Sequence, residues 1–143
     1  MKVLVFVVLG ALIMGFAGCS SDDDAYVLTD RFFISQFQNI SLNPNDFIGR
    51  TIRYDGIFMP VQWQDDAIYF VARFSDDDCC GGVGGIIGFE VYLNDIEPVG
   101  RDTWVEITGI LEEAYDSDFG SFMRLNAVSM VELDEPGQEF VTK

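Results

Sequence analysis

The central and C-terminal parts of the chain show the alternation of apolar and polar residues that is typical of β-strands. Short alternating stretches are separated by clusters of Gly, Asp, Asn and Pro, which favour turns. The pattern predicts five main strands, which span residues 51–59, 67–74, 86–93, 103–112 and 121–133. Polar connections are predicted at 62–66, 75–85, 94–102 and 113–120, and a short edge strand at 139–141.

Within the predicted strands, the spacing of apolar residues identifies which side chains share a face. In the second strand Ile68, Phe70, Ala72 and Phe74 point the same way. The last strand is long, and we expect it to bend near Ala127. In the first, third and fourth strands, the residues predicted to share the apolar face are Ile52, Tyr54, Phe58, Ile87, Phe89, Val91, Leu93, Val105, Ile107 and Leu111.

The segment before the first of these strands has a different pattern. Residues 26–28 are compatible with a short strand, whereas Phe33, Phe37 and Ile40 recur at the spacing of one helix face. We therefore expect a short helix over residues 30–40, followed by turns at 43–46 and 49–50.

Five strands joined by turns favour a sheet that closes on itself over an α/β fold. Gly56, Gly88 and Gly109 lie inside predicted strands, where glycine commonly marks a bulge or sharp coiling. The 13 phenylalanines are enough to fill a small barrel. The sequence thus predicts a mainly β fold, a five-stranded barrel of the oligonucleotide/oligosaccharide-binding (OB) type with a short N-terminal helix. A small β-sandwich is the alternative.

The N-terminus has the pattern of an export signal. Lys2 precedes an apolar run over residues 3–17, which is shorter than the roughly 20 residues that a membrane-spanning helix needs. The run ends in Phe16-Ala17-Gly18-Cys19, which resembles the bacterial lipoprotein box. We expect residues 1–18 to be a signal peptide, Cys19 to carry lipid, and residues 19–25 to be an acidic tether. Residues 26–143 then form one domain.

These features place the mature chain outside the cytoplasm, anchored by lipid to the cell membrane, or to an outer membrane if the host has two. Removing residues 1–18 removes one lysine and no carboxylate, which takes the net charge from −16 to −17. Such a surface repels phosphate backbones and argues against nucleic-acid binding. The chain contains no histidine, which excludes Ser-His-Asp and Cys-His nucleophiles. We expect no enzymatic activity.

Adjacent cysteines are the sharpest candidate site. Cys79 and Cys80 follow Asp76-Asp77-Asp78 in the predicted 75–85 connection. Neighbouring cysteines can form a structural pair, ligate a divalent metal with help from the aspartates, or act as a redox dithiol. The aspartates would raise the thiol pKa, which disfavours the redox role. The sequence leaves these three alternatives open.

Two tryptophans are candidates for ligand stacking. Trp104 lies on the strand face opposite Val105 and Ile107, and Trp63 lies in the predicted 62–66 connection. Either ring could offer a surface for a sugar, although packing at an edge is the alternative.

A longer set of residues resembles a known family. These are Asn43 to Ile52 leading to Asp55-Gly56, then Phe70-Val71-Ala72-Arg73-Phe74, Cys79-Cys80 and Asp102 to Gly109. They resemble the C-terminal OB-like domain of the YcgQ-like bacterial proteins, uncharacterised membrane-associated partners of predicted permeases, and a group of short, uncharacterised Firmicute lipoproteins. The resemblance supports the barrel and implies a membrane-protein or transporter partner.

Three functions are therefore compatible with the sequence. The first is a non-enzymatic, membrane-anchored module that binds a partner protein or a cation near a transporter. The second is a thiol redox or metal-dependent protein centred on Cys79 and Cys80, and the third is a glycan-binding surface module that uses the barrel face around Trp104.

Overall fold

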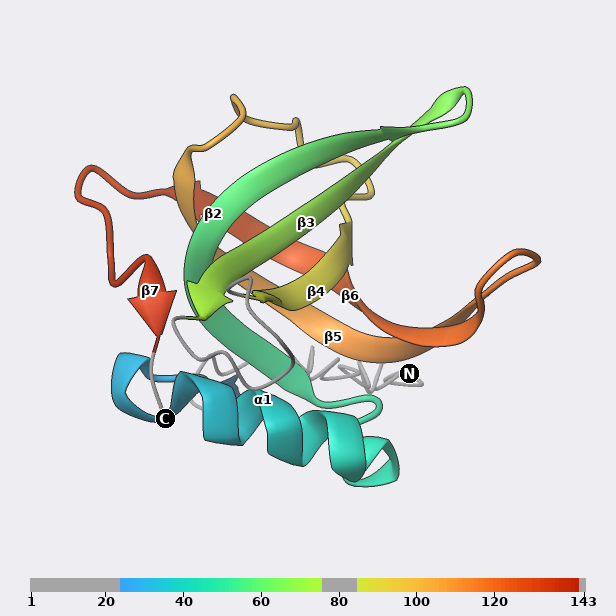
Figure 1. The fold of residues 1–143 in the computed structure, drawn as a ribbon, viewed down its shortest axis with the longest axis horizontal. Coiled ribbons are helices and arrows are strands. Elements are labelled where there is room, and N and C mark those ends of the chain that lie inside the picture. Colours follow the sequence, from blue (N-terminus) through green and yellow to red (C-terminus); the bar gives the residue numbers. More distant parts are fainter. Residues whose placement is uncertain (1–23, 76–84, 142–143) are drawn as a thin grey trace, which may run out of the picture.

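The barrel predicted from the strand pattern is present in the computed structural model, which describes residues 24–75 and 85–141. In this part of the chain five strands close into a barrel in the order β2–β3–β4–β6–β5 and back to β2 (Figure 1). All neighbours pair antiparallel except β4 and β6, which run parallel. This is the strand order of an OB barrel. The barrel strands are β2 (Thr51–Trp63), β3 (Asp66–Ser75), β4 (Ile86–Tyr92), β5 (Trp104–Asp116) and β6 (Gly120–Glu132).

Two short strands extend the sheet in parallel at its margins. β1 (Tyr26–Val27) pairs with the start of β2, and β7 (Phe140–Val141) pairs with the end of β3. Between β1 and β2 the chain forms the 3₁₀ turn η2 (Asp30–Phe32), the helix α1 (Phe33–Leu42) and the 3₁₀ turn η3 (Pro44–Asp46).

Helix α1 covers one end of the barrel (Figure 1). The predicted apolar face is confirmed, because Phe33 and Ile40 are fully buried and the ring of Phe37 lies 4.8 Å from that of Phe89. Phe33 also packs edge-on against Tyr54, at 5.6 Å between ring centroids. The helix therefore completes the core that the sheet alone would leave open.

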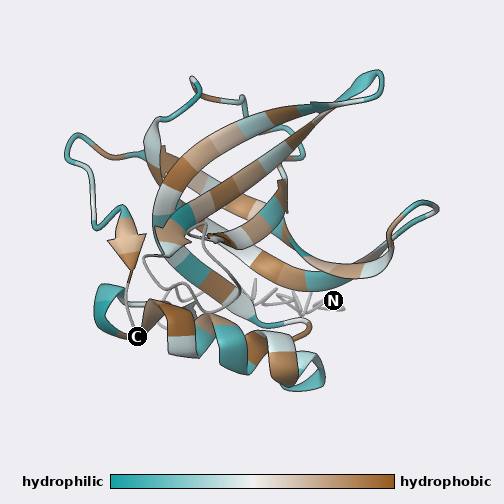
Figure 2. Ribbon diagram, in the orientation of Figure 1, coloured by the Kyte–Doolittle hydropathy of each residue, from teal (hydrophilic) through white to brown (hydrophobic). Residues whose placement is uncertain are grey.

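The core contains the residues predicted for three of the strands. Figure 2 shows the alternation of apolar and polar residues along the strands, with hydrophilic loops and hairpin tips. Tyr54 is buried, and its hydroxyl donates to the Val71 carbonyl at 2.7 Å and accepts from the Phe89 amide at 3.2 Å. Burial raises the pKa of this phenol above its ordinary value.

The second strand differs from its simplest interpretation. Of the predicted face only Ala72 is buried, whereas Ile68, Phe70 and Phe74 lie outside the core. The core side of β3 carries Tyr69, Val71 and Arg73. Apolar residues occupy both sides of β3, so alternation alone could not identify the core face.

The two long hairpins have shorter loops than the sequence predicts. The 62–66 connection reduces to Gln64 and Asp65, and the 113–120 connection to residues 117–119. These strand ends project beyond the barrel, so both of their faces are exposed and they need no apolar residues.

The predicted role of the strand glycines is confirmed. A Cβ added at Gly88 would lie 2.1 Å from the Val71 carbonyl oxygen, and one added at Gly56 would lie 2.9 Å from the Val71 side chain. The bend expected near Ala127 coincides with a register shift: Gly109 pairs with Ala127 whereas Thr108 pairs with Ser129, which gives β6 one extra residue. The glycines thus allow the strands to approach closely enough to close a narrow barrel.

Candidate functional site

Several candidate residues lie outside the described part of the chain. These are the lipidation candidate Cys19 and the metal or redox candidates Asp76, Asp77, Asp78, Cys79 and Cys80. The structure does define the residues that flank this segment, since the Ser75 amide at the end of β3 donates to the Gly85 carbonyl just before β4, at 2.8 Å.

The two tryptophans occupy different environments. Trp104 is half-buried at the start of β5: the Arg73 guanidinium carbon lies 5.7 Å from its ring centroid, and Gly137 lies so close that an added Cβ would be 3.1 Å from its ring. Trp63, at the end of β2, is 40% exposed. Trp104 pairs with Ile57, which lies six residues, or about 20 Å of strand, before Trp63. The structure therefore does not bring the two rings into one stacking site.

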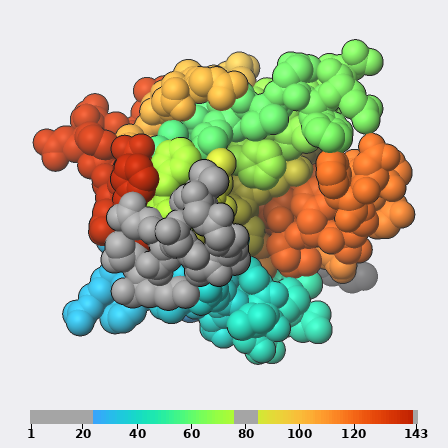
Figure 3. Space-filling view, in the orientation of Figure 1, coloured from blue at the N-terminus to red at the C-terminus, as the bar shows by residue number. Residues whose placement is uncertain are grey.

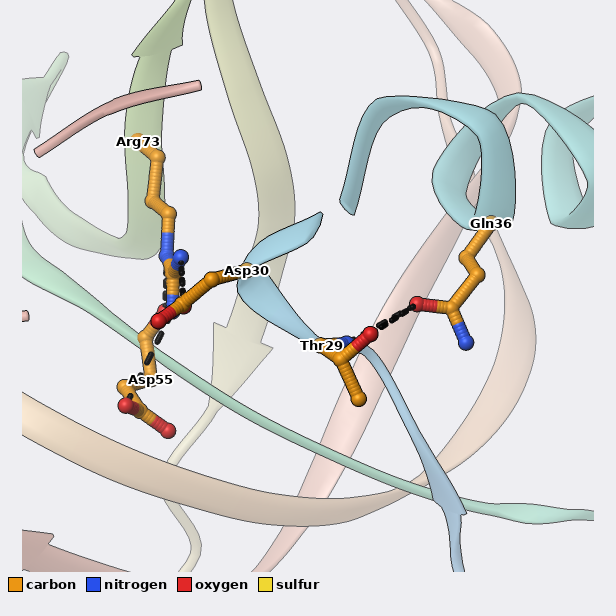
Figure 4. A network of polar contacts seen from close by, with 5 residues as sticks. All are labelled: Thr29, Asp30, Gln36, Asp55 and Arg73. Carbon is orange, nitrogen blue, oxygen red and sulfur yellow. Dashed lines mark hydrogen bonds and ion pairs between the residues drawn. The ribbon is translucent and has the colours of Figure 1, made fainter. Parts of the chain in front are cut away.

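A buried guanidinium fixes the N-terminal segment to the barrel. Arg73 is 1% exposed, and its Nε–H donates to the Asp55 carbonyl at 2.7 Å. The guanidinium pairs with the Asp30 carboxylate, and a second nitrogen lies 3.7 Å from the Asp55 carboxylate (Figure 4). The central carbon of the Arg73 guanidinium lies 4.6 Å from the centroid of the Phe33 ring. Because its guanidinium already has a hydrogen bond, ion pairs and a ring contact within the protein, Arg73 is part of the fold and is not available to a ligand.

A second polar contact in the same region holds the start of the helix. The Gln36 carboxamide accepts a hydrogen bond from the Thr29 amide at 2.8 Å and donates one to the Val27 carbonyl at 2.9 Å. Figure 4 shows Gln36 reaching from α1 back to Thr29. These contacts tie β1, η2 and α1 into one structural unit.

The outer surface of β3, β4 and β6 carries aromatic and charged side chains close together. Phe70 pairs with Glu90 across β3 and β4, and Glu90 pairs with Arg124 across β4 and β6. Tyr92 and Phe122 follow two residues from these positions and therefore point to the same side. We call Phe70, Glu90, Tyr92, Phe122 and Arg124 the β4 face.

Arg124 has its partners within this surface. Its Nε–H donates to Glu112 at 2.7 Å, and its guanidinium carbon lies 4.9 Å from the ring centroid of Tyr92. Asn126 donates to the other oxygen of Glu112 at 3.3 Å. Both oxygens of Glu112 are thereby used, and the guanidinium carbon lies over an aromatic ring.

Glu90 receives no hydrogen bond from another described residue, whereas both oxygens of Glu112 on the same surface do. It is partly buried, and this burial raises its pKa above the ordinary value; Arg124 opposes the shift and Asp116 adds to it. Asp116 itself accepts from the amides of Asp118 and Phe119 in the hairpin turn, at 2.7 and 3.2 Å. Glu90 is thus a partly desolvated negative group beside apolar rings, with unused acceptor capacity.

The two projecting hairpins meet beside this surface. The ring of Trp63 lies 5.1 Å from that of Phe119, and the Gln64 side chain donates to Asp118 at 3.4 Å. In Figure 3 the green tip of the β2–β3 hairpin and the orange tip of the β5–β6 hairpin touch. Phe119 is 63% exposed, so this aromatic bridge between hairpins is accessible to a ligand. In OB barrels, the central strands and the two corresponding loops bind ligands.

Residues 24–75 and 85–141 contain no group of three Cys, Asp or Glu side chains placed to hold a metal ion. They also contain no helix with the length and hydropathy required to cross a bilayer. A hollow of about 470 Å³ lies where the chain leaves β4, lined by Tyr69 and by residues 93–98.

The sequence did not reveal the β4 face. Arg124 lies more than 30 positions after Glu90 and Tyr92, and the three residues meet only because β4 and β6 pair in parallel. The available signal was the outward set of β3, Ile68 and Phe70, which are apolar although they lie outside the core. That excess of apolar residues on a strand is a sign of a second functional surface.

Comparisons with known proteins place this architecture in a family. The family model of the DUF1980 C-terminal domain matches residues 17–143. The UPF0703 protein YcgQ of Bacillus subtilis (strain 168) is 30% identical over 94 residues, which are 66% of this chain and 33% of that protein. The chain thus spans about a third of the length of this relative, and both matches are to uncharacterised families. The barrel, with its N-terminal helix and paired hairpins, belongs to the DUF1980 C-terminal domain family.

Proposed function

We propose that this protein is a non-enzymatic binding module that is anchored by lipid on Cys19 outside the cytoplasm and binds a membrane-protein partner through the β4 face. The observation that carries the proposal is the β4 face itself, with aromatic rings and ion-paired side chains on the outside of a barrel whose core is complete without them. Packing of the fold does not account for this composition, whereas a binding surface does.

The length of the tether supports a partner in the same membrane. Tyr26, in the first strand, lies seven positions after Cys19, and a fully extended chain of this length spans at most about 25 Å. A lipid on Cys19 would therefore keep the barrel within about one domain diameter of the bilayer. At that distance the β4 face can reach the extracytoplasmic parts of a membrane protein. The resemblance to proteins that accompany predicted permeases favours a transporter as this partner.

Photocrosslinking in the native host tests both parts of the proposal. A benzophenone amino acid replaces Tyr92, which is 51% exposed on the β4 face, or Leu42, which is exposed at the end of α1, as the matched control. We expect an adduct with an integral membrane protein from the Tyr92 position alone, and its loss when Cys19→Ser removes the anchor. Equal adducts from both positions, or none from Tyr92, would contradict the use of this face. An adduct that persists with Cys19→Ser would contradict the role of the lipid.

A further inference from the structure

The charges around the β4 face indicate what kind of partner it accepts. Carboxylates outnumber the one guanidinium, that of Arg124, among the described residues of this surface and its two hairpin tips: they are Asp66, Glu90, Glu112, Asp116 and Asp118. Arg124 is already paired with Glu112, so the net field is negative. A ligand of opposite charge is favoured both on approach and when bound.

The aromatic residues narrow the ligand class further. Phe70 lies across from Glu90 on β3, and Tyr92 lies two residues along β4 on the same side. Trp63 and Phe119 add a second pair of rings at the hairpin tips. A carboxylate beside aromatic rings suits a cation on an apolar stem, since the ring faces attract the charge and the stem packs on the rings. Lysine and arginine side chains have this form.

We propose that the β4 face binds a basic polypeptide segment of the partner, and that one lysine or arginine of this segment pairs with Glu90 beside Phe70 and Tyr92. This inference rests on the proposed function and identifies the chemistry of the partner. The incoming cation supplies the hydrogen bonds that Glu90 does not receive from the described residues. Arg124 stays with Glu112 and Tyr92.

Glu90→Gln is a suitable probe because it should not weaken the fold. Burial disfavours the ionised carboxylate in the folded state, so the folded-state pKa is raised. Stability associated with this group is therefore greatest at low pH and is lost as the pH rises through the raised pKa. At neutral pH the neutral amide removes this penalty, and thermal stability should stay the same or rise. A loss of binding in this variant then reports on the contact.

The experiment selects ligands for the full-length lipoprotein in lipid nanodiscs from a phage library of random decapeptides. We expect the selected peptides to share a lysine or arginine flanked by apolar residues. Glu90→Gln should weaken binding of the selected peptide by about tenfold or more, as should norleucine or citrulline in place of the basic residue. Glu106→Gln removes the same charge from β5, about 20 Å along the strand from Glu112, and should change the affinity less than about twofold.

Two results would overturn the inference. Peptides without a basic residue, or peptides equally sensitive to Glu90→Gln and Glu106→Gln, would show that this pairing does not occur. Failure to select any peptide, together with oligosaccharide binding that Trp63→Ala abolishes, would assign the surface to glycans. In either case crosslinking from position 92 still reports separately on whether a membrane protein occupies the face, so the two proposals can fail independently.

Discussion

Replacement of Gly88 by alanine tests how closely the barrel strands must approach. Gly88 lies in β4 opposite Ala72 of β3, and a Cβ at this position would lie 2.1 Å from the Val71 carbonyl oxygen and 2.6 Å from the Ala72 Cα. Both are backbone atoms that no rotamer change can move. Ordinary contact distances require a separation of about 1 Å more, which would stretch the neighbouring ladder hydrogen bonds beyond their usual 2.7–3.2 Å.

The expected loss of stability follows from this geometry. Overpacking of a well-packed interior costs about 1–3 kcal/mol, and a backbone clash of this size belongs at or above the upper end. For a domain of this length, about 3 kcal/mol corresponds to a decrease in melting temperature of about 10 °C. Thermal unfolding followed by circular dichroism measures it. Gly85→Ala is the control, because an added Cβ there meets nothing within 4 Å. If the melting temperatures of the two variants differ by less than about 2 °C, the close approach of β3 and β4 is wrong.

Two further predictions concern Arg73 and the cysteine pair. Arg73→Ala should lower the free energy of unfolding by about 3 kcal/mol, whereas Arg73→Met should lose less than half of that, because the longer side chain still fills the space between Phe33 and Trp104. Urea denaturation measures both, and equal losses would show that the charge matters more than the packing. If Cys79 and Cys80 bind a divalent metal, native mass spectrometry of protein purified without chelator should show a mass excess that disappears when both are serine. A mass about 2 Da low that reductant restores would instead indicate a disulfide.

The inner surface of the barrel could be predicted because a core imposes a strict rule on each strand. Val105, Ile107 and Leu111 are all fully buried, as their spacing predicted, and the helical spacing of Phe33 and Ile40 was equally informative. Each of these predictions depends on one segment and on the exclusion of water from apolar side chains. No knowledge of which strands are neighbours was required.

Arg73 shows where this rule stops. From the sequence alone, a charged residue in a strand is expected to face outward. Arg73 is nevertheless buried, because Asp30, 43 positions earlier in the chain, supplies the opposing charge. Its burial also reverses the apparent phase of β3, since Phe70 then points away from the core. The sequence contains both residues but not the contact between them, which depends on how η2 docks against the barrel.

The β4 face was still less predictable, because it requires the complete topology. Glu90 and Arg124 become neighbours only through the parallel pairing of β4 and β6, which closes the barrel between strands that are not consecutive in the chain. Short-range patterns cannot specify such a pairing. Outward-facing residues are also free of the packing rule, so their identities carry a functional signal only after the surface has been assembled.

The energetics of Glu90 are what separate function from folding on this surface. Burial disfavours its ionised form in the folded state and raises its pKa, with Arg124 opposing the shift, and no described residue donates a hydrogen bond to the carboxylate. A threonine or glutamine at this strand position would pair with Phe70 across β3 at no such cost. Glu112 differs, because Arg124 and Asn126 satisfy both of its oxygens. Glu90 thus keeps acceptor capacity that Glu112 has used within the fold, and a cation of another molecule can take up that capacity.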